Sequence, residues 1–377
     1  MPVTLGIDSL MNSRLSLLSG TKIALVTNHT GYSASGRSTL DILYSSPNTE
    51  LAALFSPEHG ILGDLDSEVE NGYHAQTGIP IFSLYGDKKK PDKEQLNGID
   101  VLIYDIQDVG CRYYTYISTL LGCMEAAAET GTTLMVLDRP NPVSGVRIEG
   151  PLADPYELSF VACHPLPIRH GLTVGELAKL FVQERRLSTN LIVIPCEGWN
   201  RGMYWDDTGL MWINPSPNIR SLTQAILYSG IATVEFTNIS VGRGTNFPFQ
   251  LVGAPWIDPF QLASCLNANC YPGVKFMPVK FTPDERQYSG ELCFGVQIEV
   301  IDREKVDSVE VGMGLMSVLQ SLYKGVWDPT LTNTLLANSR LYNILNEGDF
   351  APSLSHTWQE DLLHYKTRIN PHLLYHE

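Results

Sequence analysis

The chain has 377 residues, of which 44% are hydrophobic and 18% charged, and its formal net charge is −15 at pH 7. This length favours two domains, and the composition is typical of a globular protein rather than of a disordered or fibrous one. The negative charge disfavours nucleic acid as a partner, since the only basic run, residues 88–90, lacks the interleaved aromatic residues of a nucleic-acid surface.

Short apolar runs alternate with amphipathic stretches over the first 150 or so residues, a pattern that predicts strands and helices around a mainly parallel sheet. The predicted strands cover residues 22–28, 51–55, 101–105 and 133–138, and the predicted helices cover residues 38–43 and 116–130. The predicted fold class is therefore α/β, with a Rossmann-like first half.

The second half differs in texture and predicts a smaller α+β domain. Its predicted helices cover residues 174–185, 222–229 and 309–323, and its predicted strands cover residues 191–195, 274–281 and 292–301. A Pro-rich stretch with poor periodicity lies between Gly150 and Gly171. We therefore predict one domain over residues 1–160 and a second over residues 161–377. No segment repeats at a fixed period, which excludes solenoids and propellers.

The N-terminal segment has neither the basic stretch nor the apolar core of a signal peptide, and no stretch is long enough to span a membrane. As written, the sequence predicts a cytoplasmic protein, or a periplasmic or secreted one if a signal has been removed. The seven cysteines have no CxxC spacing and no Cys/His pattern typical of zinc sites. We expect buried thiols, and neither a metal nor another cofactor.

Polar segments follow four predicted strands of the first half. They cover residues 28–30, 56–60, 105–108 and 138–142. In an open parallel sheet, ligands bind beyond the carboxyl ends of the strands. One polar strand end is ordinary turn chemistry, but four at the same rim favour a binding site.

Three common chemistries lack their sequence signatures. The first strand leads into residues 28–31 rather than into G-x-G-x-x-G, and no G-x-x-x-x-G-K-[ST] motif occurs, which disfavours NAD and ATP. The G-x-S-x-G motif of serine hydrolases is absent, and the nine histidines are scattered without metal-binding pairs. Carboxylate chemistry remains, and it requires two acidic groups of different pKa in one cleft.

Glu58 is the candidate general acid, because it follows an apolar strand and burial at the rim would raise its pKa. A solvated turn or a helix-cap carboxylate is an equally good interpretation of Glu58 taken alone. Asp105 and Asp108 are the candidates for its catalytic partner, to hold a water, a sugar hydroxyl or an acetamido N–H. Either of them is also consistent with a carboxylate that only caps the following turn.

Arginine, aromatic and amide side chains are the predicted substrate-binding groups. Arg112 stands beside two tyrosines and offers a cation for a carboxylate next to flat faces for a sugar ring, although alternate tyrosines also pack in cores. Two loops of the second half, at residues 212–218 and 241–246, are dense in hydrogen-bonding groups. The full predicted set is Asn28, His59, Arg112, Tyr113, Tyr114, Arg139, Asn214, Arg243 and Thr245.

Short motifs recur in order along nearly the whole chain. They lie at residues 6–8, 26–31, 55–60, 104–110, 112–116, 138–142, 149–151, 169–171, 215–218 and 242–245. Through these motifs the chain resembles the bacterial exo-β-N-acetylmuramidases, a family formerly described as a domain of unknown function.

The resemblance implies a Rossmann-like N-terminal domain, a smaller C-terminal domain and a cleft between them. It also implies removal of N-acetylmuramic acid (MurNAc) from the non-reducing ends of peptidoglycan fragments, with MurNAc-GlcNAc oligosaccharides as partners and Glu58 as the catalytic glutamate. Arg112, Arg139 or Arg243 would then bind the lactyl carboxylate of muramic acid. The 2-acetamido group of this sugar permits substrate-assisted cleavage, in which Asp105 or Asp108 would orient the acetamide or a water.

Two alternatives stay open on the sequence. One is a hydrolase that acts on another glycan or an ester with the same carboxylates. The other is a non-catalytic protein whose two lobes bind a cell-wall fragment, which predicts saturable binding without a product.

Overall fold

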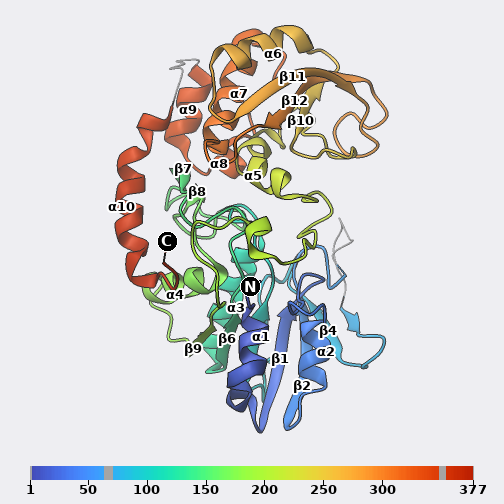
Figure 1. Cartoon of the computed structure of the whole chain (residues 1–377), viewed down its shortest axis with the longest axis vertical. Helices are drawn as coiled ribbons and strands as arrows, with labels where there is room; N and C mark the ends of the chain where they lie inside the picture. The colour runs from blue at the N-terminus through green and yellow to red at the C-terminus, as the bar shows by residue number, and fades with distance from the viewer. Residues whose placement is uncertain (1, 63–70, 348–353, 377) are drawn as a thin grey trace.

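The structure, a computed structural model, describes residues 2–62, 71–347 and 354–376. The molecule is elongated, with a mainly parallel sheet at one end and a smaller antiparallel sheet at the other (Figure 1). The predicted fold class, an α/β half followed by a smaller α+β half, is confirmed. Within the described residues, no helix has the length and apolar character needed to cross a membrane.

Seven strands form the larger sheet, in the order β3-β4-β2-β1-β5-β6-β9. Every neighbouring pair is parallel except β3 with β4. The strands are β1 (Thr21–Thr27), β2 (Thr49–Ser56), β3 (Gly72–Tyr73), β4 (Pro80–Ser83), β5 (Val101–Asp105), β6 (Thr133–Leu137) and β9 (Leu191–Ile194).

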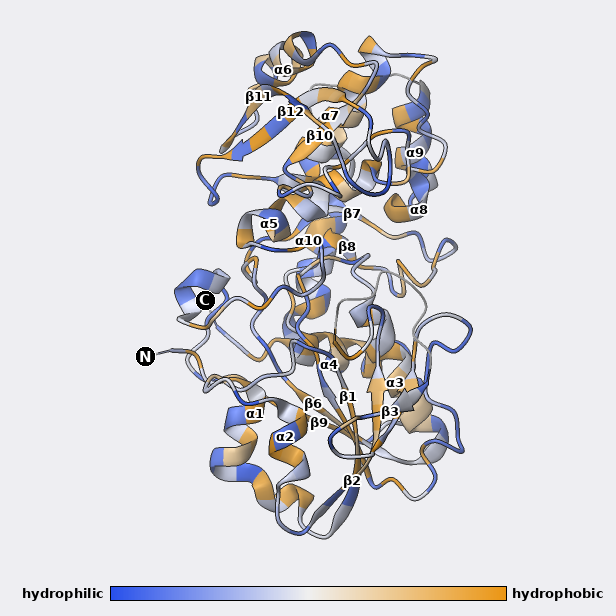
Figure 2. Ribbon diagram, turned by 90° about the vertical axis from the view of Figure 1, so that its right-hand side faces the viewer, coloured by the Kyte–Doolittle hydropathy of each residue, from blue (hydrophilic) through white to orange (hydrophobic). Residues whose placement is uncertain are grey.

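Different helices cover the two faces of this sheet, which is why its central strands are continuous apolar runs. Alternate residues of β1 belong to different clusters: Ile23 and Leu25 pack with α2 residues, whereas Ala24 and Val26 pack with α3 and α4 residues. The covering helices are α1 (Gly6–Ser9) and α2 (Thr39–Tyr44) on one face, and α3 (Tyr116–Thr130) and α4 (Val174–Glu184) on the other. Figure 2 shows apolar residues concentrated along the sheet and α3.

The first sheet continues beyond residue 160, where the sequence predicts the end of the first domain. Strand β9 pairs with β6 in parallel, and α4, which precedes it, packs on the same sheet. The structure therefore places α4 and β9 in the first half instead of the second. Strand β9 pairs in parallel with β6, and α4 is the crossover helix that precedes it.

The smaller sheet has the order β10-β12-β11 and is antiparallel. Its strands are β10 (Leu251–Ala254), β11 (Val274–Phe281) and β12 (Cys293–Val300), and the helices around it are α5 (Leu222–Ile231), α6 (Pro259–Ala268) and α7 (Ser308–Leu322). Helices α5 and α7 touch at Gly230, where a Cβ would lie only 1.7 Å from the carbonyl oxygen of Ser308. Glycine is therefore required at this crossing.

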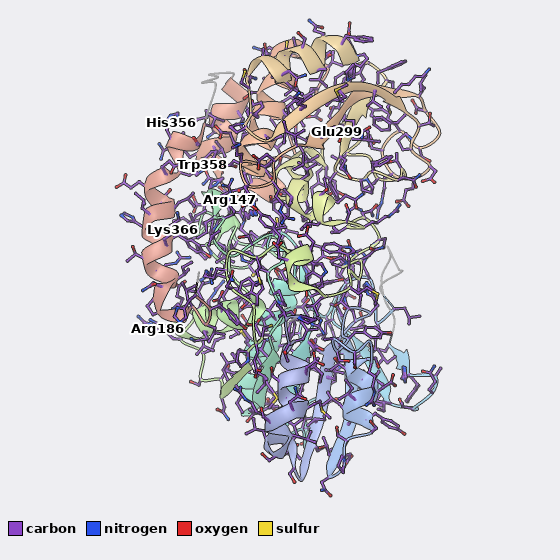
Figure 3. All side chains as sticks on the ribbon, viewed as in Figure 1. Arg147, Arg186, Glu299, His356, Trp358 and Lys366 are labelled. Carbon is purple, nitrogen blue, oxygen red and sulfur yellow. The ribbon has the colours of Figure 1, made fainter. Side chains whose placement is uncertain are left out.

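Several contacts tie the two halves together. A two-stranded sheet of β7 (Glu149–Leu152) and β8 (Pro167–Arg169) lies between them. Arg147, labelled in Figure 3, donates to the carbonyl oxygens of Glu304 and Val306, at 3.1 and 2.5 Å. Three more α-helices of the described residues are α8 (Asn333–Leu336), α9 (Ser339–Glu347) and α10 (Gln359–Ile369).

The end of the chain returns to the first half. Helix α10 runs back along the molecule (Figure 1), and the Tyr365 hydroxyl on it donates to the carbonyl oxygen of His170 at 2.9 Å. Beyond α10, the Tyr375 hydroxyl donates to Asp138 at 2.5 Å, at the end of β6. The C-terminal residues therefore help to hold the first sheet, although they follow the second half in sequence.

Candidate active site

The turn after β2 carries Glu58. The amide of Leu84 donates to the carbonyl oxygen of Ser56 at 2.8 Å, so the end of β2 is held by the chain that follows β4. His59 and Gly60 then both have positive φ values, +70° and +74°. A left-handed conformation is uncommon for a histidine, and it turns the chain sharply just after the glutamate. Glu58 is half-buried there and faces a cavity.

This cavity, which we call the Glu58 pocket, has a volume of about 320 Å³ and lies between the two halves of the chain. That volume suits a small-molecule site. Its lining residues are Glu58, His59, Tyr85, Tyr113, Tyr114, Thr115, Tyr116, Val161, Ser216, Asn218, Ile219, Tyr228, Glu235, Phe236, Arg243, Phe249, Arg286 and Leu335. Of the predicted site residues, the structure brings Glu58, His59, Tyr113, Tyr114 and Arg243 together here.

Thr115 fixes the carboxylate of Glu58. Its Oγ1 donates a hydrogen bond to Glu58 Oε2, and Thr115 is the residue from which α3 starts. The position of α3 on the sheet therefore determines where the glutamate points.

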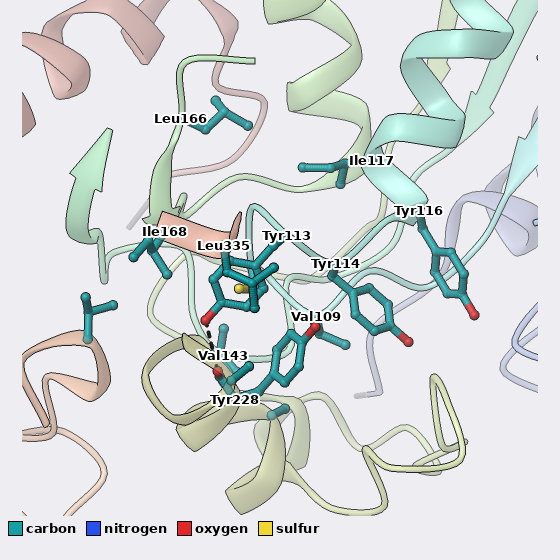
Figure 4. Packing of buried hydrophobic residues seen from close by; sticks show 14 of the residues in the cluster. Val109, Tyr113, Tyr114, Tyr116, Ile117, Val143, Leu166, Ile168, Tyr228 and Leu335 are labelled. Carbon is teal, nitrogen blue, oxygen red and sulfur yellow. Dashed lines mark hydrogen bonds between the residues drawn. The ribbon is translucent and has the colours of Figure 1, made fainter. Parts of the chain in front are cut away.

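Tyrosines from both halves build one wall of the Glu58 pocket (Figure 4). The ring of Tyr228 packs edge-on against Tyr113, Tyr114 and Phe249, with centroids 5.3, 5.9 and 4.8 Å apart. The Tyr113 hydroxyl is used internally, since it donates to the carbonyl oxygen of Tyr228 at 3.0 Å. Burial raises the pKa of Tyr113, Tyr114 and Tyr228, so these phenols stay neutral. These tyrosines therefore pack against one another as core residues do, which is the alternative that the sequence left open.

Glu235 is a second carboxylate in the Glu58 pocket, and the sequence reasoning missed it. Its Oε1 lies 2.7 Å from Nε of Arg243, whose guanidinium stands 5.9 Å from the ring centroid of Phe249. Burial is the main cause of the raised pKa of Tyr228, and the negative charges of Glu235 and Glu58 contribute to the rise. Both carboxylates therefore lie near the Tyr228 ring. Glu235 follows a 3-10 turn rather than a strand, so the pattern of polar strand ends does not mark it.

Two further polar residues of the pocket were also missed. Arg286 is exposed at the pocket and adopts a positive φ of +61°. Asn218 is 3% exposed, and its Oδ1 has no hydrogen-bond partner among the described residues. An unpaired buried acceptor is costly unless a ligand or a water satisfies it. Asn218 lies in the loop at residues 212–218, for which the sequence predicts Asn214 as the binding residue.

Asp105 does not reach the Glu58 pocket. Its side chain is fully buried and accepts hydrogen bonds from Arg139 Nε at 2.6 Å, from Arg139 Nη2 at 3.0 Å and from Thr39 Oγ1. Asp105 is therefore not among the residues that line the Glu58 pocket, and both of its carboxylate oxygens accept hydrogen bonds from other side chains. The same ion pair removes Arg139 from the residues that contact the Glu58 pocket.

Asp108 and Arg112 are also directed elsewhere. Asp108 accepts from the Gly110 amide at 2.7 Å, and its Oδ2 lies 3.3 Å from Nε2 of the fully buried His170. Arg112 is fully buried and donates to four carbonyl oxygens, those of Pro151, Leu166, Leu335 and Leu336. Burial lowers the pKa of Arg112 to about 10. This arginine holds both halves of the chain together and is not available to a substrate.

Besides Arg112 and Arg139, three more predicted binding residues lie outside the lining of the Glu58 pocket. Asn28 is 4% exposed and accepts from Thr30 through its Oδ1. Asn214 is exposed, and its carbonyl oxygen lies 2.6 Å from Nε2 of His29. Thr245 donates to the carbonyl oxygen of Gly242 at 2.6 Å and so stabilises its own turn. Hydrogen bonds within or between loops account for Asn214 and Thr245, whereas Asn28 Nδ2 is buried and has no hydrogen-bond partner among the described residues.

Two family models match consecutive parts of the chain. The model described as "Exo-beta-N-acetylmuramidase NamZ, N-terminal" matches residues 23–223, and its C-terminal counterpart matches residues 226–375. The chain belongs to the NamZ exo-β-N-acetylmuramidase family. The Glu58 pocket takes side chains from both matched parts of the NamZ fold, with Glu58 from the first and Glu235 from the second.

Similar proteins match this chain over nearly its whole length. The peptidoglycan β-N-acetylmuramidase NamZ of Bacillus subtilis (strain 168) is 40% identical over 99% of this chain and 91% of its own. Two crystal structures of DUF1343 family proteins from Bacteroides fragilis are also similar. One has a TM-score of 0.93 at 35% identity and covers 99% of both chains. The other has a TM-score of 0.82 at 30% identity and covers both chains completely.

Proposed function

We infer that this chain is an exo-β-N-acetylmuramidase, a glycoside hydrolase that removes MurNAc from the non-reducing ends of peptidoglycan fragments. The observation that carries this inference is one pocket, in a chain of the NamZ family, that holds Glu58 from the first half and Glu235 from the second. Glycosidases commonly act through two carboxylates that flank the scissile bond.

We assign Glu58 the role of general acid, which protonates the glycosidic oxygen as the bond to the leaving sugar breaks. Its carboxyl group faces the pocket, while the Thr115 hydroxyl holds Oε2 in place. Oε1 is then the oxygen left to address the substrate. This arrangement gives the proton donor a fixed direction, which general acid catalysis requires.

Glu235 is the better candidate for the second group than either aspartate proposed from the sequence. It shares the Glu58 pocket, whereas Asp105 and Asp108 do not line it. Arg243 holds Glu235 through Nε, so the carboxylate is oriented by a partner within the same pocket. In this position Glu235 orients either an attacking water or the 2-acetamido group of the sugar.

Recognition of the lactyl carboxylate falls to the arginines that line the Glu58 pocket. Arg243 is the one of the three predicted arginines that remains, and Arg286 joins it from a neighbouring loop. Arginine pairs with carboxylates through a planar fork, which favours a muramic acid unit over a sugar without the lactyl group. The packed tyrosines that line the pocket form one boundary of the space for the sugar ring.

The test is incubation of the purified chain with the disaccharide MurNAc-GlcNAc, followed by mass analysis. We expect free MurNAc and free N-acetylglucosamine (GlcNAc) in equal amounts. A disaccharide of two GlcNAc units is the matched control and should stay intact, since it lacks the carboxylate. Saturable binding of MurNAc-GlcNAc without any product would instead support the binding-protein alternative, and cleavage of the control would support a different glycan.

A further inference from the structure

A second cavity opens at the rim of the first sheet, at a place where sheets of this type bind ligands. The chain passes from β1 to β2 on one side and later to β5 on the other, so the strand order reverses between β1 and β5. Ligands of open α/β sheets bind in the crevice beyond such a reversal. The Glu58 pocket follows β2 instead, which leaves the crevice without an assigned role.

This second cavity, which we call the switch-point cavity, has a volume of about 460 Å³. Its lining residues are Leu5, His29, Thr30, Tyr32, Ser33, Ala34, Gly36, Gln107, Arg139, Trp205, Leu210, Met211 and Ile213. They include residues that follow β1, β5 and β6, three of the four polar strand ends noted in the sequence. The volume is in the range of small-molecule sites.

Three buried polar side chains of this cavity have hydrogen-bonding capacity left over. Arg139 uses Nε and Nη2 for Asp105 and Tyr32, but its Nη1 takes part in no hydrogen bond among the described residues. Gln107 and Trp205 are 4% and 7% exposed. Within the described residues, neither Gln107 Oε1 nor Trp205 Nε1 has a partner. The site therefore offers two donors and one acceptor, and the two buried atoms among them, Gln107 Oε1 and Trp205 Nε1, are costly to leave unpaired.

The charge and polarity of the lining select a neutral ligand. No acidic side chain lines the switch-point cavity among the described residues, and Asp105 already balances the charge of Arg139. An anion would therefore lack a free counter-charge. Leu5, Leu210 and Ile213 supply apolar surface, and Trp205 adds a flat indole face, which suits the apolar face of a sugar ring.

We propose that the switch-point cavity binds an N-acetylated amino sugar such as a GlcNAc unit. An acetamido group carries a carbonyl acceptor for Arg139 or Trp205 and an N–H donor for Gln107, and its methyl group suits the apolar wall. The choice of a sugar over a short peptide amide rests on the function proposed above. The cavity would hold a GlcNAc unit further along the glycan, away from the bond that is cut.

One loop separates this cavity from the Glu58 pocket. Leu210, Met211 and Ile213 line the switch-point cavity, whereas Ser216 and Asn218 line the Glu58 pocket. The loop is anchored between them, because the carbonyl oxygen of Asn214 lies 2.6 Å from His29 Nε2 and that of Pro215 accepts from the Tyr116 hydroxyl at 3.1 Å. Filling one cavity therefore need not block the other.

The test is calorimetric titration of the full chain with GlcNAc, with glucose as the matched sugar that lacks the acetamido group. Ala34→Phe fills the switch-point cavity from an exposed position, and Ala268→Phe is the same change at an exposed site on α6. We expect GlcNAc to bind the parent and Ala268→Phe with equal affinity. Glucose should bind the parent at least about tenfold more weakly than GlcNAc does, and Ala34→Phe should bind GlcNAc at least about tenfold more weakly than the parent does. Ile213→Trp is a second filling variant, should Ala34→Phe fail to fold.

Hydrolysis of a chromogenic muramide, measured on the same preparations, separates this proposal from the proposed function. Ala34→Phe should keep the parent kcat within about twofold, and GlcNAc should not compete with the muramide. The proposal is overturned if GlcNAc does not bind the parent, if glucose binds equally well, or if a folded filling variant binds GlcNAc like the parent. Absence of muramide hydrolysis together with normal GlcNAc binding would overturn the proposed function alone.

Discussion

The Glu58 pocket and the switch-point cavity lie at the same rim of one sheet, yet their chemistry differs. The Glu58 pocket holds two carboxylates and two arginines, and the second half of the chain supplies much of its lining. The switch-point cavity has one lining arginine, already paired with Asp105, and no acidic lining residue among those described. The difference shows that polar residues at a strand end indicate where ligands can bind, but not which of the cavities there is catalytic. What decides the role is which groups remain unpaired once the side chains have packed.

The largest effect expected from this comparison is on turnover after Glu235→Gln. The variant keeps the size of the side chain but removes the charge that we assign to the second catalytic group, so kcat on a chromogenic muramide should fall by about 10³-fold. Glu360→Gln, at an exposed position on α10, is the control and should leave kcat unchanged. A folded Glu235→Gln enzyme with parental kcat would remove Glu235 from the mechanism.

Asp105→Asn should show the opposite behaviour, with a loss of stability rather than of catalysis. Asp105 balances the buried Arg139, and removal of one partner from a buried pair costs about 3 kcal/mol or more. We expect a lower free energy of unfolding in urea, but a near-parental kcat for the folded enzyme. Asp87→Asn, at an exposed site, is the matched control. A stable Asp105→Asn variant with lost turnover would restore the catalytic role predicted from the sequence.

Thr115→Val should have a smaller effect, confined to the Glu58 pocket. The change keeps the shape of the side chain and removes the hydrogen bond to Glu58 Oε2, so we expect kcat to fall by about tenfold with little change in KM. Thr115→Ser keeps the hydroxyl and should restore most of the activity. If Thr115→Ser were as slow as Thr115→Val, packing rather than positioning of the glutamate would explain the loss.

Asp307→Asn should change stability to an extent that depends on pH, without an effect on the Glu58 pocket. Burial, reinforced by the nearby Glu149, raises the pKa of Asp307 from 3.8 to about 7. A carboxyl whose pKa is raised on folding contributes stability that is fully present below about pH 4 and is lost as the pH rises through about 7. Asparagine can still accept from the Glu310 amide as the N-cap of α7. The Tm of the variant, relative to the parent, should therefore rise between pH 4 and pH 8, and a constant difference would contradict this.

Much of the fold could be predicted because its elements have clear periodic patterns. The helix predicted over residues 116–130 is α3 with the same bounds, and the strand predicted over residues 274–281 is β11. The sequence also predicts the strand over residues 191–195, but places it in the second half, whereas it is β9 of the first sheet. Pairing between strands far apart in sequence depends on packing, and a single apolar run does not show which sheet it joins.

The site was predicted less completely than the fold. Glu58, His59 and Arg243 were found from strand ends and turn-rich loops, and they line one pocket. Arg112 was misread, because an arginine among tyrosines looks the same in sequence whether it binds a ligand or four backbone carbonyls. Glu235 was missed because nothing in the local sequence marks it, and only the folded chain brings it into the same pocket as Glu58.

The most direct test of the central claim is the kcat of Glu58→Gln on a chromogenic muramide, measured beside its far-UV circular dichroism and Tm. If Glu58 is the proton donor, kcat should fall by about 10³-fold, while the spectrum and Tm stay close to those of the parent. A folded Glu58→Gln enzyme that hydrolyses the muramide at the parental rate would contradict the account.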